Sequence, residues 1–246
     1  MSLLSRLFVL AVVALMPAIA LQTYNEFRIR REREVEVHEQ ALSVAKLAAA
    51  QQHQIIQGMR QVLIAMSELP AIKAEDRDAC NAYLATMRER FPAFITFLVT
   101  DLNGASFCHT RPDHPRVVIA HRAYFATVLK TGAFTVGEFS IGFSNGLKVI
   151  QFALPFHRDD GQMGGVIVAA LGLDWLAQSI ARNGVPAGAS LAIADRNGTY
   201  LARYPDNDRF VGRTMPRGRR GDADPPDTGD AVDLDGVGLW LFGPAD

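Results

Sequence analysis

The sequence predicts an α+β fold, in which a long N-terminal helix precedes two lobes built on antiparallel strands. A strand–turn–strand motif occurs twice, and the turns Asp101–Gly104 and Asp195–Gly198 both read Asp-x-Asn-Gly. Such turns supply the positive φ angles of a tight hairpin, and apolar β-forming residues flank both of them. The stretch 23–69 contains no proline and a single glycine, which favours one long helix. The repeated hairpin indicates two similar lobes in tandem.

The composition fits a folded protein without a nucleic-acid partner. The 246 residues are 49% hydrophobic, which is enough for a core, and the net charge of −1 offers no basic surface. His109, His114 and His121 match no standard metal-ligand spacing. Serines near histidines fall in expected turns, and no phosphate-binding glycine loop is present. We therefore expect no catalytic residue, metal or cofactor; an enzyme such as a hydrolase is a third class, which nothing favours.

The first residues determine the expected compartment. Residues 1–22 combine Arg6 with the charge-free run Leu7–Leu21, which favours a signal anchor, that is, an uncleaved transmembrane helix. A cleaved signal peptide is the alternative, because Ala18-Ile-Ala20 resembles a small-residue cleavage site. Both interpretations send the rest of the chain out of the cytoplasm. A buried N-terminal helix of a cytosolic protein is the remaining interpretation.

Cys80 and Cys108 are the only cysteines. In an exported protein such a pair is most simply a disulfide, which would tie a predicted helix to the end of the first hairpin. Two separate buried thiols are the alternative.

Residues 23–69 form the predicted stalk helix, which Pro70 ends. Apolar residues with the spacing of a coiled-coil seam follow its second half: Ile55, Met59, Val62, Met66 and Leu69. This stripe suits packing on a partner helix, which would make the protein a homodimer. Packing on the protein's own domain is the alternative.

Residues 70–186 contain the elements of the first lobe, whose order follows from caps, turns and apolar runs. Helices are expected at Asp76–Arg90, His121–Lys130 and Leu173–Ala181. Strands are expected at Phe94–Thr100, Ala105–His109, Phe134–Ser140, Leu147–Phe156 and Gly165–Leu171. This order predicts one sheet of five antiparallel strands with a helical layer on one face.

Residues 187–246 are expected to form only part of a second lobe. The hairpin Ala189–Arg203 opens this lobe, and Val237–Phe242 supplies a last strand. Between them, residues 213–233 are dense in Arg, Asp, Gly and Pro and are expected to be disordered.

Several short motifs carry a resemblance to a known family. They are His121-Arg-Ala-Tyr-Phe125, Gly137-Glu138, Val149–Pro155, Gly161, Gly164-Gly165-Val166, Leu173-Asp-Trp-Leu176, Asp195–Gly198 and Leu201–Pro205. With the anchor, the long helix, the two lobes and the paired cysteines, they resemble the double Cache family, whose lobes are PAS-like. The match covers about residues 23–215 and is stronger in the first lobe than in the second.

The resemblance implies a sensing function. Family members are the extracytoplasmic sensor regions of bacterial histidine kinases, diguanylate cyclases and chemoreceptors, and a small molecule binds their membrane-distal lobe. We expect residues 70–186 to be that lobe, in a protein of the bacterial inner membrane with most of its chain in the periplasm. No second span or output domain follows in the sequence, so a truncated receptor is expected. A stand-alone membrane-tethered or secreted ligand-binding protein is the alternative.

Arg122, Tyr124 and Phe125 lie on the short helix that borders the expected pocket. An arginine beside aromatic residues suits a carboxylate ligand, because guanidinium makes paired charge-assisted hydrogen bonds to it. The alternative places the two aromatic residues in the core and Arg122 in a salt bridge. On the following strand, Lys148 and Gln151 cannot share a face because they are an odd number of residues apart. Gln151 is the preferred ligand contact.

The resemblance also bears on whether the ligand is an amino acid. Amino-acid-binding members hold the ligand's amino group with an aspartate near the end of the last strand of this lobe. The corresponding position here is about Ala170, and Asp174 is more simply the cap of the closing helix. We therefore expect that a free α-amino acid is not the ligand.

Overall fold

The computed structural model describes residues 50, 53–113, 115–142, 146–182, 190–215, 232–234 and 237–242, the last two ranges as backbone only. By its internal contacts the chain divides into Met1–Ser43 and Val44–Asp246, and all described residues belong to the second unit. The signal anchor predicted over 1–22 and residues 23–49 and 51–52 of the predicted stalk helix lie outside the described residues. None of the described helices is long and apolar enough to span a membrane.

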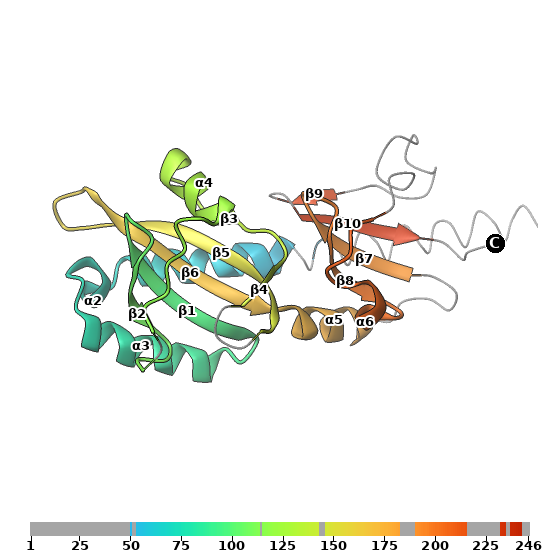
Figure 1. Ribbon diagram of the computed structural model, residues 1–246, viewed down its shortest axis with the longest axis horizontal. Coiled ribbons are helices and arrows are strands. Elements are labelled where there is room, and N and C mark those ends of the chain that lie inside the picture. The colour runs from blue at the N-terminus through green and yellow to red at the C-terminus, as the bar shows by residue number, and fades with distance from the viewer. Residues whose placement is uncertain are drawn as a thin grey trace, which may run out of the picture. The chain divides into compact units, whose positions relative to one another are not determined.

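The first sheet has six antiparallel strands in the order β2-β1-β6-β5-β3, with β4 also paired to β5 (Figure 1). The strands are β1 Phe94–Asp101, β2 Ser106–His109, β3 Thr135–Val136, β4 Ser140–Ile141, β5 Lys148–His157 and β6 Met163–Gly172. The sequence predicted five strands, because it treated Phe134–Ser140 as one. The structure divides this segment into β3 and β4, and residues 137–139 between them belong to neither strand, although the N–H of Gly137 still donates to the carbonyl of Gln151 in β5.

Helices cover both faces of this sheet, so the expectation of one helical layer is wrong. Leu98, Val168 and Ala153 are cross-strand neighbours on β1, β6 and β5, and they pack with α4, Ala123–Thr131. On the opposite face, Phe152 of β5 stacks on Phe134 with ring centroids 6.2 Å apart. With both faces covered, β5 is buried from Val149 to Phe156, as is usual for strands that helices cover on both sides.

A helix over residues 53–67 packs on the Phe152 face (Figure 1, blue). The guanidinium of its Arg60 lies 5.6 Å from the ring centroid of Phe134. Its buried side chains are Ile56, Met59, Leu63 and Met66. This stripe shares Met59 and Met66 with the predicted one, but Ile56 and Leu63 replace the predicted Ile55 and Val62. The predicted Ile55, Val62 and Leu69 are half-buried. The buried stripe therefore serves the packing of the protein's own domain.

The helix α3, Arg77–Arg90, begins where the sequence predicted. Its N-cap Asp76 accepts hydrogen bonds from the backbone N–H groups of Asp78 and Ala79, which satisfies donors that the first helical turn leaves unpaired. It follows the short α2, Pro70–Lys73. A disulfide joins Cys80 of α3 to Cys108 of β2, which fastens this helix to the edge of the sheet.

The remaining helices close the first sheet and lead to the second. Gly132 ends α4 with a left-handed φ of 63°, a conformation that glycine adopts without the steric cost of a side chain. The helix α5, Leu173–Arg182, follows β6 directly and corresponds to the predicted Leu173–Ala181.

The second sheet has four strands in the order β8-β7-β10-β9. They are β7 Ser190–Asp195, β8 Tyr200–Tyr204, β9 Val232–Leu234 and β10 Val237–Phe242, and the short α6, Asn207–Phe210, follows β8. The prediction of disorder over 213–233 is wrong at both ends of that range, where the chain is ordered. Thr214 pairs with Thr199 and Met215 is only 2% exposed, whereas β9 takes in Val232 and Asp233. Residues 216–231 lie outside the described part of the chain.

The two hairpins are built alike, as the repeated motif predicted. Oδ1 of Asp101 accepts hydrogen bonds from two backbone N–H groups of its own turn, each at 2.9 Å. Oδ1 of Asp195 does the same at the same distances. Gly104 and Gly198 close the two turns with φ angles of 75° and 73°. The aspartate thus fixes the turn locally in both lobes.

Each hairpin also holds a segment that returns to it later in the chain. The backbone N–H of Ile119 donates to the carbonyl of Gly104 at 2.9 Å, and Met215 donates to Gly198 at the same distance. In the first lobe the returning segment leads directly into α4. The Asp101 hairpin therefore holds in place the segment before α4, which forms one wall of a pocket.

Candidate functional site

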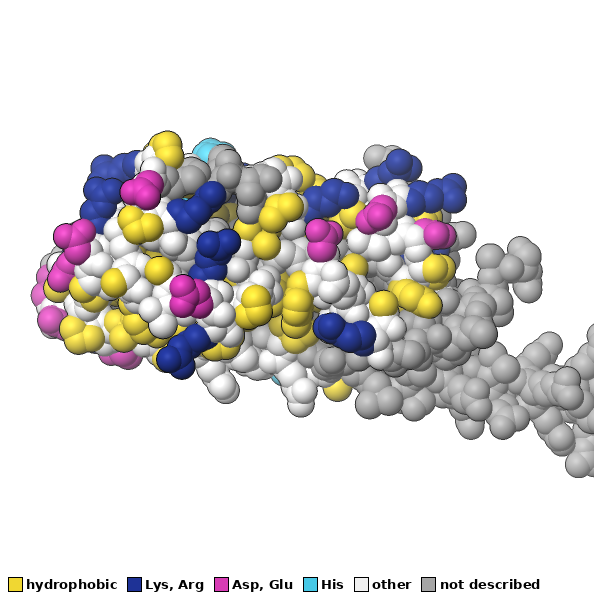
Figure 2. Space-filling model, turned by 90° about the horizontal axis from the view of Figure 1, so that it is seen from below, with side chains coloured by type: hydrophobic (Ala, Val, Ile, Leu, Met, Phe, Trp, Pro, Cys, Tyr) yellow, Lys and Arg dark blue, Asp and Glu magenta, His cyan; other side chains and the backbone are white. Residues whose placement is uncertain are grey.

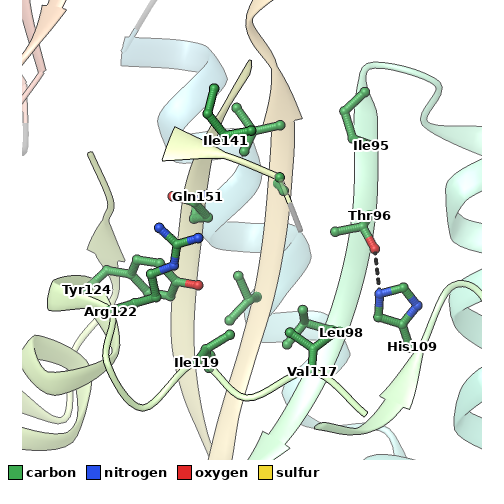
Figure 3. A pocket seen from close by; sticks show the side chains of 14 residues that line it. Ile95, Thr96, Leu98, His109, Val117, Ile119, Arg122, Tyr124, Ile141 and Gln151 are labelled. Carbon is green, nitrogen blue, oxygen red and sulfur yellow. Dashed lines mark hydrogen bonds between the residues drawn. The ribbon is translucent and has the colours of Figure 1, made fainter. Parts of the chain in front are cut away.

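A pocket lies between the α4 face of the first sheet and the segment that leads into α4 (Figure 3). It encloses a cavity of about 40 Å³, a few times the space that one buried water needs. Its walls are mostly apolar, with polar groups at a few points. The lining residues are Ile95, Thr96, Leu98, His109, Val117, Ile119, Arg122, Tyr124, Ile141, Gly142, Val149, Gln151, Val168 and Ala170.

The floor of the pocket is a row of residues across three strands. Thr96 of β1 is opposite Ala170 of β6, and Ala170 is opposite Gln151 of β5. Because side chains alternate between faces along a strand, these three share the pocket face. Ala170 is the position at which the family resemblance would place an aspartate, and it lies in the pocket wall. None of the described residues that line the pocket is Asp or Glu.

Arg122 and Tyr124 form one polar corner of the pocket. Arg122 is the N-cap of α4 and is half-buried, and Figure 3 shows its guanidinium in front of Tyr124 and turned toward Gln151. Tyr124 is 8% exposed. Burial raises the pKa of its phenol to about 12, against a smaller lowering by the positive charge of Arg122. The corner therefore presents a permanent positive charge beside a neutral hydroxyl.

The Gln151 amide completes this corner and is not fully satisfied. Its Nε2 donates to Oγ of Ser140, whereas its buried Oε1 has no hydrogen-bond partner among the described residues. A buried carbonyl oxygen without a partner costs about 1–3 kcal/mol. The glycine at position 137 leaves room beside the amide, because a Cβ there would lie 3.0 Å from Oε1. A bound molecule that hydrogen-bonds to the amide would remove this cost.

His109 and Thr96 line the opposite edge of the pocket, and the sequence analysis did not select them as ligand contacts. His109 is 6% exposed, and its Nδ1 accepts a hydrogen bond from the backbone N–H of Arg111 at 3.0 Å. The same Nδ1 also lies 3.2 Å from the carbonyl oxygen of Arg111, and Nε2 lies 3.3 Å from Oγ1 of Thr96. The backbone N–H of His109 donates to Oδ1 of Asn81 at 2.8 Å, next to the disulfide. The pairing of His109 with Leu98 across the first hairpin was the signal that could have identified it.

The structure brings three of the four predicted ligand contacts together. Arg122, Tyr124 and Gln151 line the pocket. Phe125 does not line it, because its side chain is 3% exposed and packs in the core between α4 and the sheet, as the alternative interpretation described. The role of the three in binding a ligand stays a prediction.

Two other kinds of site find no support in the described residues. No group of three His, Cys, Asp or Glu side chains there could hold a metal ion; His114 lies outside them. The segment Gly142–Gly146 reads Gly-x-Ser-x-Gly, a pattern that the sequence analysis overlooked. A nucleophilic serine needs this pattern between a strand and a helix. Here its two glycines lie between β4 and β5, with the N–H of Gly146 donating to the carbonyl of Gly142, so the pattern precedes a strand and not a helix.

Solved structures with a similar fold are sensor domains. The sensor domain of the Vibrio cholerae histidine kinase DctB has a TM-score of 0.65 at 13% identity, over 85% of this chain and 98% of its own. The ligand-binding domain of the Pseudomonas aeruginosa PAO1 amino-acid chemoreceptor PctC, solved with GABA, has a TM-score of 0.61 at 17% identity, over 81% and 94%. That of the Campylobacter jejuni chemoreceptor Tlp3, solved with L-valine, has a TM-score of 0.62 at 11% identity, over 85% and 93%.

The chain has the fold of the Cache-like extracellular sensor domains. The resemblance read from its motifs is thereby confirmed at the level of fold. The sequence itself matches no protein-family model and no curated protein. The Cache-like fold was therefore recognisable from motif residues and geometry, at identities of 11–17% to these structures.

Proposed function

We propose that this chain is the extracytoplasmic, small-molecule-sensing part of a bacterial membrane receptor. The observation that carries the proposal is the polar corner formed by Arg122, Tyr124 and Gln151 in a pocket of the Cache-like fold. A guanidinium beside a neutral hydroxyl, with no carboxylate in the pocket wall, favours a small carboxylate as the ligand. The ligand classes of the solved neighbours support a small molecule but differ among themselves.

The proposed location is the bacterial inner membrane, with most of the chain in the periplasm. The charge-free run Leu7–Leu21 supports a membrane anchor. The Cys80–Cys108 disulfide supports an oxidising compartment, because disulfides rarely persist in the cytosol. Fractionation of cells that express the protein, with protease added to intact spheroplasts, tests both points. Resistance of the protein to that protease would contradict a periplasmic location.

Calorimetric titration of the purified protein with a panel of small carboxylates, amines, purines and amino acids tests the proposed function. We expect at least one carboxylate to bind, and Arg122→Gln to abolish that binding, because the charged partner of the carboxylate is lost. Arg88→Gln is the matched control, since Arg88 is an exposed arginine of α3 outside the pocket. Absence of binding across the whole panel, or equal binding to the Arg122→Gln variant, would contradict the proposal.

Homodimerisation through the stalk helix stays a prediction, and the structure changes the face on which it rests. The buried stripe of residues 53–67 packs within its own domain, whereas Ile64 is 46% exposed on the outer side. We propose that a dimer would use this outer side. Sedimentation of the protein and of Ile64→Glu tests the idea, and a monomer at high concentration would contradict it.

One face of the molecule carries charges of both signs. On the face in Figure 2, Lys and Arg side chains lie among Asp, Glu and hydrophobic side chains instead of forming one basic patch. Nucleic-acid binding needs such a patch, because phosphate contacts supply most of its affinity.

A further inference from the structure

We infer that the pocket selects a short 2-hydroxycarboxylate over the corresponding amino acid and the unsubstituted acid. The inference rests on the proposed function, because it takes the pocket to be the ligand site. It concerns which chemical group next to the carboxylate the protein recognises. The main evidence is the hydrogen bonding of the Gln151 amide.

The charges in the pocket disfavour an ammonium group on the ligand. Arg122 is positive, and the described lining residues include no Asp or Glu that could pair with a cation. Ala170 lies on the floor, next to Gln151 in the cross-strand row. An ammonium group buried there would lose its hydration without gaining a counter-charge. The substituent beside the carboxylate is therefore expected to be uncharged.

The unsatisfied Gln151 amide favours a ligand substituent that can form a hydrogen bond. Gln151 is 6% exposed, and Oε1 has no partner among the described residues, while Nε2 is bonded to Ser140. A ligand hydroxyl can donate to this oxygen. If the amide turned over, Ser140 would donate to Oε1 and Nε2 would need an acceptor, which a hydroxyl can also be. A hydroxyl thus satisfies either orientation, whereas a C–H group satisfies neither.

The placement of these groups indicates where the hydroxyl stands on the ligand. Figure 3 shows the guanidinium of Arg122 directed toward Gln151, so the two groups that recognise the ligand are neighbours. A carboxylate at Arg122 then brings the carbon next to it close to the amide. The remaining walls are apolar, with Leu98, Ile119 and Val168 among them, and the cavity is small. These features fit a short alkyl chain with a hydroxyl on carbon 2.

Three compounds with one carbon skeleton test the inference: lactate, propionate and alanine carry a hydroxyl, a hydrogen and an ammonium group on carbon 2. Titration of the purified protein is expected to show lactate binding at least about tenfold more tightly than propionate. Propionate has no hydroxyl and would leave the buried Gln151 amide without a hydrogen-bond partner. Alanine is expected to bind more weakly than lactate by a larger factor. 3-Hydroxypropanoate, with its hydroxyl one carbon further away, is expected to bind more weakly than lactate.

The variant Gln151→Leu should remove the preference rather than all binding. We expect the affinities for lactate and propionate to differ by no more than about twofold in this variant, because leucine cannot form a hydrogen bond with the hydroxyl of lactate. Gln162→Leu is the matched control, because Gln162 is exposed in the β5–β6 turn, and it should keep the full preference. Melting curves show whether Gln151→Leu is folded; if it is not, the ligand series on the unchanged protein decides alone.

The outcomes separate this inference from the proposed function. Propionate or alanine binding as tightly as lactate would overturn the inference, and so would an unchanged preference in Gln151→Leu. If none of these compounds binds while another small molecule binds in an Arg122-dependent way, the inference fails and the proposed function stands. If nothing in the wider panel binds, the proposed function fails as well.

Discussion

The backbone N–H of Phe139 donates a hydrogen bond of 2.9 Å to Oδ2 of Asp195. Phe139 lies between β3 and β4, and Asp195 is the turn aspartate of the second hairpin. A second contact joins the same two segments, since Nη2 of Arg196 donates to the carbonyl of Val136 at 2.6 Å. The segment between β3 and β4 also carries Gly137, beside the Gln151 amide. The second lobe thus holds a segment that borders the pocket of the first.

Asp195→Asn is expected to destabilise the protein more than Asp101→Asn. In both variants the remaining amide oxygen keeps the two turn hydrogen bonds. At position 195 the new NH₂ group faces the N–H of Phe139, in a site where the aspartate is 5% exposed, whereas Asp101 is half-buried. Urea unfolding should show a loss of about 1–3 kcal/mol for Asp195→Asn and less than about 1 kcal/mol for Asp101→Asn. Equal losses would mean that the bond to Phe139 contributes nothing.

Gly137→Ala is expected to disturb the pocket through the same segment. A Cβ at this position would lie 3.0 Å from Oε1 of Gln151 and 3.2 Å from Cδ1 of Tyr124. Overpacking of this kind costs about 1–3 kcal/mol, and titration should show weaker ligand binding because both side chains must move. Gly58→Ala is the control: nothing lies within 4 Å of its Cβ, and alanine in a helix should raise stability by about 0.5–1 kcal/mol. Unchanged binding in Gly137→Ala would show that the pocket tolerates the methyl group.

The elements that the sequence predicted well are those with local signals. Asp76 caps α3 and Gly132 ends α4 through contacts within a few residues, so both helix boundaries could be read from the chain. The division of Phe134–Ser140 into β3 and β4 carries no such local signal, and Phe139, between the two strands, donates its backbone N–H to Asp195 far along the chain. The strand β9 was missed for another reason: it lies at the end of a segment whose composition indicates disorder, although it pairs with β10 only a few residues later.

The pocket was predictable where one motif contained its residues. Arg122 and Tyr124 share the motif that begins α4, and Gln151 followed from the alternation of side chains along one strand. Phe125 was wrongly included in the pocket, since adjacent helical residues point in different directions. His109 reaches the pocket only through the register of the first hairpin, which motif matching does not use.

Removal of the disulfide is expected to lower stability and loosen one edge of the pocket. Cys80 and Cys108 are separated by 28 positions, and a crosslink over a loop of this length contributes about 3–4 kcal/mol by restricting the unfolded chain. The double variant Cys80→Ala/Cys108→Ala should lose about that much free energy of unfolding in urea. A reductant should lower the melting temperature of the original protein and leave the double variant unaffected. Equal stability of the oxidised and reduced protein would contradict the expectation.

The buried phenol of Tyr124 is expected to make stability fall at high pH. Burial raises its pKa in the folded protein to about 12, above the ordinary value of 10, so the folded state favours the neutral form. This contribution is fully present below pH 10 and is lost as the pH rises from about 10 to 12. Two pKa units correspond to about 2–3 kcal/mol.

Tyr124→Phe tests this, because phenylalanine cannot ionise. The difference in free energy of unfolding between the original protein and Tyr124→Phe should be constant from pH 7 to 9 and should shift by about 2–3 kcal/mol against the original protein by pH 12. Tyr204→Phe, which removes a hydroxyl from a residue that is 38% exposed, controls for the loss of a phenol elsewhere. A difference that does not change with pH would mean that burial does not raise the pKa of the Tyr124 phenol in the folded protein.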